Sequence, residues 1–207
     1  FLQPMATSFF SSIQLEKVIS ISNKISSKAL YIVDSFGTMN KKKVNELLTL
    51  FDKKLNPEIF IGFHPHNNLQ LAYSNTIEFL LNKSFNRSVV IDSSLFGMGR
   101  GAGNLNTELI VHDLNNRFEN KYNFNYIIDI IETKIKFYKT QFKWGYDVDY
   151  LLSGINDCHP NYAKYLVDHD MFSYRQMNDI LSNLTETDKL RFNKKVIEKQ
   201  VNTYNPN

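Results

Sequence analysis

The chain has 207 residues, of which 43% are hydrophobic, 14% aromatic and 22% charged, and its formal net charge is +3. This composition excludes wholesale disorder and collagen-like repeats, and no apolar run is long enough for a transmembrane helix. Charged residues are scattered along the chain, so the sequence predicts neither a nucleic-acid partner nor a membrane partner. The single cysteine, Cys158, cannot form an internal disulfide, which favours a cytoplasmic location.

The first 115 residues alternate between strand-like and helix-like segments. Strands are expected at residues 5–10, 29–33, 59–63 and 88–95, and helices at 12–24, 40–55, 69–81 and 106–115. Four strand–helix units in a row predict an α/β architecture with a parallel sheet. Four units are also half of a TIM (β/α)8 barrel, which needs about 250 residues in full.

The remaining residues, 116–207, predict an all-helical extension. A long helix is expected at residues 126–142 and another at 188–201, and residues 204–207 are expected to fray. Ser173 and Gln176 form a capping-box pattern ahead of a further helix. We therefore expect two domains, a half-barrel over 1–115 and a helical extension over 116–207.

Two histidines end the third predicted strand. His64 and His66 are two residues apart, so their side chains should point to the same face of the strand, at the end where barrel enzymes place their sites. Two neutral imidazoles at that spacing suit a divalent metal. Taken alone, the pair would be interpreted as hydrogen-bonded loop histidines, but its place at the end of a barrel strand, before Asn67 and Asn68, favours a metal site.

A glycine-rich loop follows the fourth predicted strand. Four of the eight glycines of the chain lie between Gly97 and Gly103. Glycine lets the backbone approach a ligand closely, and the amides that begin a helix bind anionic oxygens. The alternative is a tight turn that packs the strand against the next helix. Asn104, at the end of this loop, would either face a metal or cap that helix.

A third polar loop follows the second predicted strand. Asp34 is a candidate for orienting a metal-bound histidine, and Ser35 is a candidate for binding a substrate oxygen. An ordinary turn is the alternative for this segment when it is taken alone. In a barrel all three loops would converge on one mouth, because each follows the carboxyl end of a strand.

Three motifs in this order resemble the HMG-CoA-lyase-like (DRE-TIM type) metal-dependent aldolases and lyases. They are Val33-Asp34-Ser35-x-Gly37, Gly62-Phe63-His64-x-His66-Asn67-Asn68-Leu69 and Asp92-x-Ser94-Leu95-x-Gly97-Met98-Gly99-x-Gly101-Ala102-Gly103-Asn104. The resemblance covers about residues 1–115. The helical part, with Trp144-Gly145-Tyr146 and His159-Pro160-x-x-Tyr162, is similar to the extension of a bacterial aldolase-like subgroup.

The glycine loop distinguishes the branches of this family. HMG-CoA lyases carry a cysteine just before the corresponding loop, and this chain has none there. The malate and citrate synthase branch shows Gly-x-Gly-Glu-Arg-x-Gly-Asn, whereas this chain has Arg100-Gly101 in place of Glu-Arg. The loop instead resembles the 4-hydroxy-2-oxovalerate aldolase branch.

The resemblance implies the C-terminal half of the barrel, its last four βα units. In this family the first strand of the barrel carries an Arg-Asp pair, and the loop after that strand carries the catalytic base. Nothing in this chain matches either of them. The chain begins at Phe1, and its first methionine is Met5, as expected for a piece of a longer protein. We therefore expect that it is inactive alone and that a missing N-terminal half-barrel, or a second chain in a homo-oligomer, completes it.

The resemblance also implies the chemistry. The complete enzyme would cleave a 4-hydroxy-2-oxo acid into pyruvate and an aldehyde through a metal-stabilised enolate. The implied metal is Mn²⁺, with Co²⁺, Mg²⁺ or Zn²⁺ as alternatives, and a 2-oxo acid is the implied substrate. An aldehyde dehydrogenase is an implied partner, as in some relatives.

Each candidate residue has an expected role in that chemistry. They are His64, His66 and Asn104 as metal ligands; Asp34 and Asn68 as residues supporting the ligands; Ser35, Gly99, Arg100 and Gly101 as substrate-binding residues; and Tyr146 and Tyr150 as a proton donor or gate. For the two tyrosines, simple packing is the alternative. Two other functions remain open: an acyl-CoA-condensing synthase or carboxyltransferase of the same superfamily, and a non-catalytic half-barrel that mediates assembly.

Overall fold

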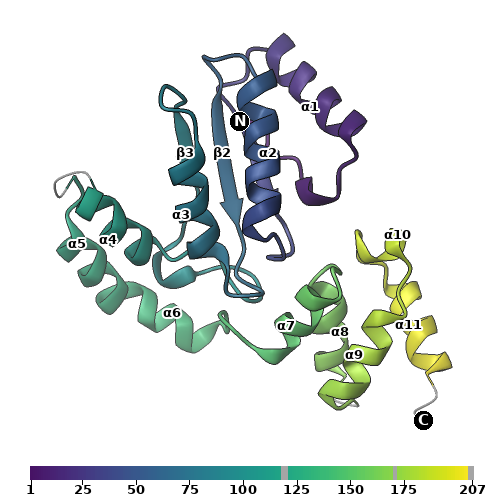
Figure 1. Cartoon of the computed structure of the whole chain (residues 1–207). Coiled ribbons are helices and arrows are strands. Elements are labelled where there is room, and N and C mark those ends of the chain that lie inside the picture. The colour runs from purple at the N-terminus through teal and green to yellow at the C-terminus, as the bar shows by residue number, and fades with distance from the viewer. Residues whose placement is uncertain (118–120, 170–171, 205–207) are drawn as a thin grey trace.

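A parallel sheet organises the first half of the computed structural model, which describes residues 1–117, 121–169 and 172–204. The sheet has three strands in the order β1-β2-β3. Its strands and connecting helices are β1 (Ala29–Asp34), α2 (Lys41–Lys54), β2 (Phe60–Pro65), α3 (Ala72–Asn82) and β3 (Val89–Ile91). Figure 1 labels β2 and β3 beside helices α2 and α3. The parallel pairing of β1 with β2 and of β2 with β3 confirms the expected α/β fold with a parallel sheet.

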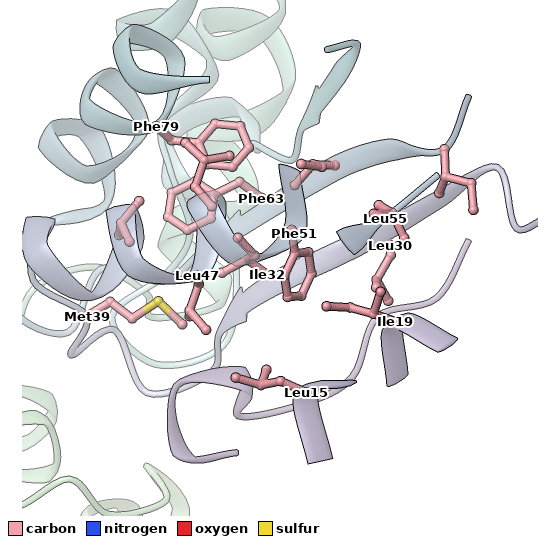
Figure 2. Close-up of a cluster of buried hydrophobic side chains, with 14 residues drawn as sticks. Leu15, Ile19, Leu30, Ile32, Met39, Leu47, Phe51, Leu55, Phe63 and Phe79 are labelled. Carbon is pink, nitrogen blue, oxygen red and sulfur yellow. The ribbon is translucent and has the colours of Figure 1, made fainter. Parts of the chain in front are cut away.

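The main hydrophobic core lies between this sheet and three helices, α2, α3 and α1 (Ser12–Lys24) (Figure 2). Strand residues alternate between faces, so Leu30 and Ile32 of β1 point toward the helices. Phe63 of β2 stacks on Phe79 of α3 with ring centroids 5.1 Å apart. Burial of this side of the sheet fixes the register of β2, and with it the direction in which His64 points.

The expected strand at residues 5–10 is wrong. Only Leu2 pairs with β1, through hydrogen bonds to Ala29 and Tyr31, and residues 7–9 form a short 3₁₀ helix. Pro4 has no amide hydrogen, so it cannot continue a ladder. Ala6 then turns the chain with φ of 54°. Further along β1, a side chain takes the place of a backbone partner: the Val33 amide donates to the Thr7 hydroxyl.

The rest of the described chain is helical. Its helices are α4 (Thr107–Arg117), α5 (Phe124–Ile130), α6 (Lys136–Gln141), α7 (Val148–Ile155), α8 (Asn161–Asp168), α9 (Tyr174–Ser182), α10 (Glu186–Lys189) and α11 (Lys194–Thr203). The long helix expected at 126–142 corresponds to α5 and α6, which a π-helical turn at Ile131–Ile135 joins. The capping box of Ser173 and Gln176 at the start of α9 is confirmed.

The single helix expected at residues 188–201 is wrong, because α10 and α11 are separate. Asn193 caps α11 by accepting from the Lys195 amide. The hydroxyl of the buried Tyr162 shares its one hydrogen between the carbonyls of Asp188 and Arg191, and it accepts from the Asn193 amide. These bonds stabilise the non-helical connection that a periodicity argument cannot detect.

Helices α7 to α11 enclose a second hydrophobic core of their own. Its largest member is Tyr162, and Met177, Ile180 and Leu181 of α9 pack around it. The expected frayed tail, 204–207, lies outside the described residues except for Tyr204, whose hydroxyl binds Asp179. Among the described helices, none is long and apolar enough to cross a membrane.

Candidate active site

His64 and His66 lie together at the carboxyl end of β2. Their ring centroids are 4.9 Å apart, with 62° between the ring planes. His64 belongs to the strand and His66 follows its last residue, so the backbone alternation sends both rings to the same side. The spacing in the sequence predicted this juxtaposition.

A hydrogen bond to Nδ1 orients each ring. The Nδ1 atom of His64 lies 2.8 Å from a carboxylate oxygen of Asp92, and that of His66 lies 2.9 Å from the carbonyl oxygen of Asp34. Both partners are acceptors, so in the neutral form of each ring Nδ1 carries the hydrogen and Nε2 keeps a lone pair. This is the tautomer that a metal-binding histidine needs, held by the kind of partner that orients such ligands.

Asp92 is a site residue to which the sequence argument gave no role. It follows β3, and its amide donates to the carbonyl of Phe63 in β2. Tyr31 donates to one carboxylate oxygen over 3.2 Å, and Gln3 to the other over 3.2 Å. Burial and the Asp92 charge raise the pKa of Tyr31 to about 12, so its hydroxyl stays a donor. The signal in the sequence was its place as the first residue of the third motif, although the strand predicted at 88–95 included it and the observed β3 ends at Ile91.

Gly62 provides the space for the Tyr31 ring that binds Asp92. The Tyr31 ring lies so close across Gly62 that a Cβ atom there would be 2.4 Å from the ring. We expect Gly62→Ala to displace Tyr31 and to lower the free energy of unfolding by about 1–3 kcal/mol. Chemical denaturation measures the loss, and it should largely disappear when Tyr31→Ala is added. Equal losses with and without Tyr31→Ala would contradict this packing.

Asp34 orients His66 through its main chain rather than its carboxylate. The carboxylate is fully buried and accepts from the amides of Thr38 and Met39, where it forms a turn after β1. Burial raises the pKa of Asp34 to about 7 despite these bonds. The expected support of a histidine is therefore present, but from a different atom.

Burial lowers the pKa of His66 to about 4, so its ring is neutral at neutral pH. A lowered pKa means that the unfolded chain takes up the proton first, near pH 6.5, and stability is lost as the pH falls from there toward 4. At pH 4.5 this loss should reach about 2.5 kcal/mol. Urea unfolding at pH 7 and pH 4.5 measures it, and His66→Gln should show a smaller drop. An equal drop would show that His66 is not the group responsible.

The glycine loop lies beside the histidines. The amide of Asn67 donates to the carbonyl of Gly103, and His66 pairs with Asn104 in an antiparallel bridge. Gly103 has φ of 80°, and a Cβ atom there would lie 2.2 Å from the carbonyl oxygen of Gly97, so the turn requires glycine. The glycines therefore permit tight packing of this loop next to His66.

Asn104 does not cap the following helix. Its side-chain nitrogen donates to the carbonyl of Met98 over 3.0 Å, and α4 begins only at Thr107. The side-chain oxygen is the atom that Asn104 has left to offer to a ligand. Of the two roles expected for Asn104, the helix cap is wrong.

A cavity of about 160 Å³ opens next to the two histidines. Its lining residues are Gln3, Met5, Val33, Ser35, Phe36, His64, His66, Arg100 and His159. Ser35 accepts a hydrogen bond from the Ala6 amide over 2.7 Å, which holds the N-terminal segment against this wall. Of the expected substrate-binding residues, Ser35 and Arg100 line this cavity.

A second, larger cavity of about 880 Å³ is lined in part by the glycine loop. Gly99, Arg100, Gly101, Tyr146 and Tyr150 are among its lining residues. Gly101 has φ of 65°, and a Cβ atom there would lie 3.0 Å from the Tyr150 ring. Burial raises the pKa of Tyr150, which keeps its hydroxyl protonated. The tyrosines lie next to this second cavity rather than over the histidines, and Arg100 lines both cavities.

The helical extension binds the glycine loop directly. The Trp144 indole donates to the carbonyl of Phe96 over 2.9 Å, and the Gly145 amide donates to the carbonyl of Gly101 over 3.0 Å. The Asn68 side chain is buried and donates to the Ser153 hydroxyl of α7 over 3.1 Å. The Asn68 amide thus joins the β2 loop to the extension, and its expected support of a metal ligand stays a prediction.

His159 is a second site residue that the sequence argument missed. It precedes α8, far from the strands in sequence, yet it lines the small cavity together with His64 and His66. In the sequence, His159 stands out only through the pattern that it forms with Pro160 and Tyr162, and that pattern by itself does not indicate a ligand. Only the docking of the extension brings this ring to the site.

The donor set fits part of a metal site. Two imidazole Nε2 atoms are available on adjacent rings, which suits a divalent cation. In the described ranges, no three or more histidine, cysteine, aspartate or glutamate side chains are arranged so that together they could hold a metal ion. Further ligands for a cation would therefore have to include groups of another kind, such as Asn104, or groups from another segment.

Comparison with known proteins gives the family. The HMGL-like family model matches residues 4–140, about two thirds of the chain. The chain belongs to the HMGL-like family. The resemblance in the three motifs is thereby confirmed, and the sheet that carries the two histidines lies within the matched region.

Curated relatives carry the name 4-hydroxy-2-oxovalerate aldolase. Proteins of that name from Geobacillus genomosp. 3 and Pelotomaculum thermopropionicum are 43% and 40% identical over 82 residues, 40% of this chain. One from Bacillus thuringiensis is 36% identical over 103 residues, 48% of this chain. The matched segments span 23%, 22% and 28% of these relatives, so the similarity covers about a quarter of their length.

A solved structure shares the fold. The N-terminal domain of a Bacteroides vulgatus protein assigned as an aldolase matches with a TM-score of 0.71 and 31% sequence identity. The match covers 84% of this chain and 54% of that one. The similarity thus extends beyond the family-model region into the helical extension.

Proposed function

We propose that this chain is part of a divalent-metal-dependent aldolase that cleaves a 4-hydroxy-2-oxo acid into pyruvate and an aldehyde. The observation that carries the proposal is the pair of imidazoles at the end of β2, whose Nδ1 atoms are held by acceptors and whose Nε2 atoms accept no hydrogen bond from the part of the chain that the structure describes. The names of the relatives point to the same class of reaction.

His64 and His66 would hold the cation, and the Asn104 oxygen is the third donor that we assign from this chain. A bound divalent cation would supply Lewis-acid polarisation of the 2-oxo group of the substrate. We propose Mn²⁺, with Co²⁺, Mg²⁺ or Zn²⁺ as alternatives, because imidazole and oxygen donors suit all of them.

The remaining residues bind and enclose the substrate. Arg100 lines both cavities, and we assign its guanidinium to the substrate carboxylate. We assign the Ser35 hydroxyl, which lines the small cavity, to a second substrate oxygen. Gly99 and Gly101 allow the backbone to come close. Tyr146 and Tyr150 would act from the larger cavity as a gate or proton donor; they share that cavity with Arg100.

We propose that residues 1–115 are the last four βα units of a (β/α)8 barrel and that residues 116–207 form its helical extension. The three parallel strands and the Leu2 bridge supply four parallel positions, which supports this arrangement. The first half-barrel, with the catalytic base, would come from another segment of the polypeptide or from a second copy. We expect the complete enzyme to be cytoplasmic, and the aldehyde could then pass to a dehydrogenase partner.

Pyruvate release tests this function. The protein, made at its natural length and loaded with Mn²⁺, should produce pyruvate from 4-hydroxy-2-oxovalerate, measured by coupling to lactate dehydrogenase. Condensation of acetyl-CoA with a 2-oxo acid in its place would move the protein to the synthase branch. A folded, Mn²⁺-free protein that is inactive in both assays would support the assembly module instead.

A further inference from the structure

His159 is held rigidly at the small cavity. Its amide donates to the carbonyl of Lys189 over 2.8 Å, and its carbonyl accepts from the Tyr162 amide over 2.9 Å. The ring lies edge-on to Phe36, with centroids 5.9 Å apart, and 6.4 Å from Phe192. Only 9% of the residue is exposed. Contacts on the backbone and on the ring therefore leave the side chain little freedom.

One hydrogen bond determines which nitrogen of His159 carries the hydrogen. The Asn161 amide donates to Nδ1 over 3.2 Å, so Nδ1 is an acceptor and the neutral ring carries its hydrogen on Nε2. This is the opposite tautomer to that of His64 and His66. His159 thus offers a donor to the cavity in which the other two rings offer lone pairs.

Burial and the nearby Arg100 lower the pKa of His159, so its ring is neutral at neutral pH. Arg100 also lines this cavity, which places a fixed positive charge and a neutral N–H donor beside the same space. Such a pair suits an anionic oxygen, because hydrogen bonds to charged groups are the stronger ones.

We propose that His159 is a further catalytic residue, whose Nε2–H donates a hydrogen bond to a carboxylate oxygen of the 2-oxo acid bound at His64 and His66. No proton is transferred in this step. The helical extension thereby contributes a substrate-binding group to the barrel site. This inference rests on the proposed function, since it takes the substrate from it.

Binding of oxalate tests the inference. Oxalate is a planar dianion whose adjacent oxygens resemble the carboxylate and 2-oxo group of the substrate. We expect His159→Phe, in the Mn²⁺-loaded protein at its natural length, to bind oxalate at least about tenfold more weakly by calorimetry. His159→Gln keeps a donor near the Nε2 position and should stay within about threefold of the unaltered protein.

Two controls separate this role from others. His169→Phe changes a histidine outside the cavity, stacked on Tyr165, and should leave oxalate affinity unchanged. Mn²⁺ affinity should be the same in His159→Phe and the unaltered protein, because His159 is not assigned as a ligand. Loss of Mn²⁺ together with oxalate would make His159 a metal ligand and overturn the inference.

A spectroscopic measurement needs no variant. In ¹⁵N-labelled protein with Mg²⁺, the imidazole spectrum should show the Nε2–H tautomer of His159, and oxalate should shift that resonance. An unshifted resonance, or unchanged oxalate affinity in folded His159→Phe, overturns this inference and leaves the proposed function standing. Failure of the unaltered, metal-loaded protein to bind oxalate overturns both.

Discussion

Replacing both His64 and His66 by alanine should remove bound Mn²⁺ from the protein at its natural length. Each ring contributes an Nε2 lone pair that is oriented by a hydrogen bond at Nδ1, and the described residues hold no other cluster of histidine, cysteine, aspartate or glutamate that could take over. We expect metal content, measured by atomic emission after dialysis, to fall from near one per chain to near zero, and pyruvate release to fall with it.

The matched control removes two histidines from elsewhere in the fold. His112 lies on α4 and His169 follows α8, and neither lines the small cavity. The double alanine variant at these positions should keep its full metal content. Full occupancy in the His64→Ala/His66→Ala protein would end the metal assignment.

Replacing Arg87 by methionine should destabilise the protein by about 3–5 kcal/mol. The guanidinium is almost fully buried, forms an ion pair with Asp52, and donates to four carbonyl oxygens at the end of α2 and in the turn that leads to β2. Those carbonyls belong to Asp52, Leu55, Asn56 and Ile59. Methionine fills the volume of the stem but leaves the Asp52 charge and the carbonyls unpaired.

Urea unfolding measures the effect of Arg87→Met. Arg117→Met is the matched control, because Arg117 forms its ion pair with Asp113 at a more exposed position of α4. The control should change the free energy of unfolding by less than about 1 kcal/mol. Comparable losses in both variants would contradict a special role for the Arg87 network.

Local patterns predicted most elements of the first half. The helix at Ser12–Lys24 matches its predicted bounds, and α2 and α3 end within about one residue of theirs. These helices pack one apolar face on the sheet, so periodicity in the sequence reports directly on their burial. The prediction of the first strand failed because proline, a left-handed residue and a side-chain hydroxyl take the place of the backbone ladder there. Hydrophobic periodicity does not reveal such a change.

The candidate site was predictable where a single strand carries it. His64 and His66 are neighbours because residues two apart on a strand share a face. The contact of Asn68 with the extension and the place of His159 in the small cavity were not predicted. Their positions depend on where the helical extension docks, and that contact joins residues about 80 or more positions apart in the chain.

The sequence by itself determined the α/β class, the family and the histidine pair, because backbone alternation and motif order are local properties. Only the tertiary structure decided which atoms orient those histidines. It joined Asp92 to His64 across neighbouring strands, used the Asp34 carbonyl instead of its carboxylate, and brought His159 into the cavity. Parallel register and helix docking set these contacts, and both depend on burial summed over the whole core rather than on any one segment.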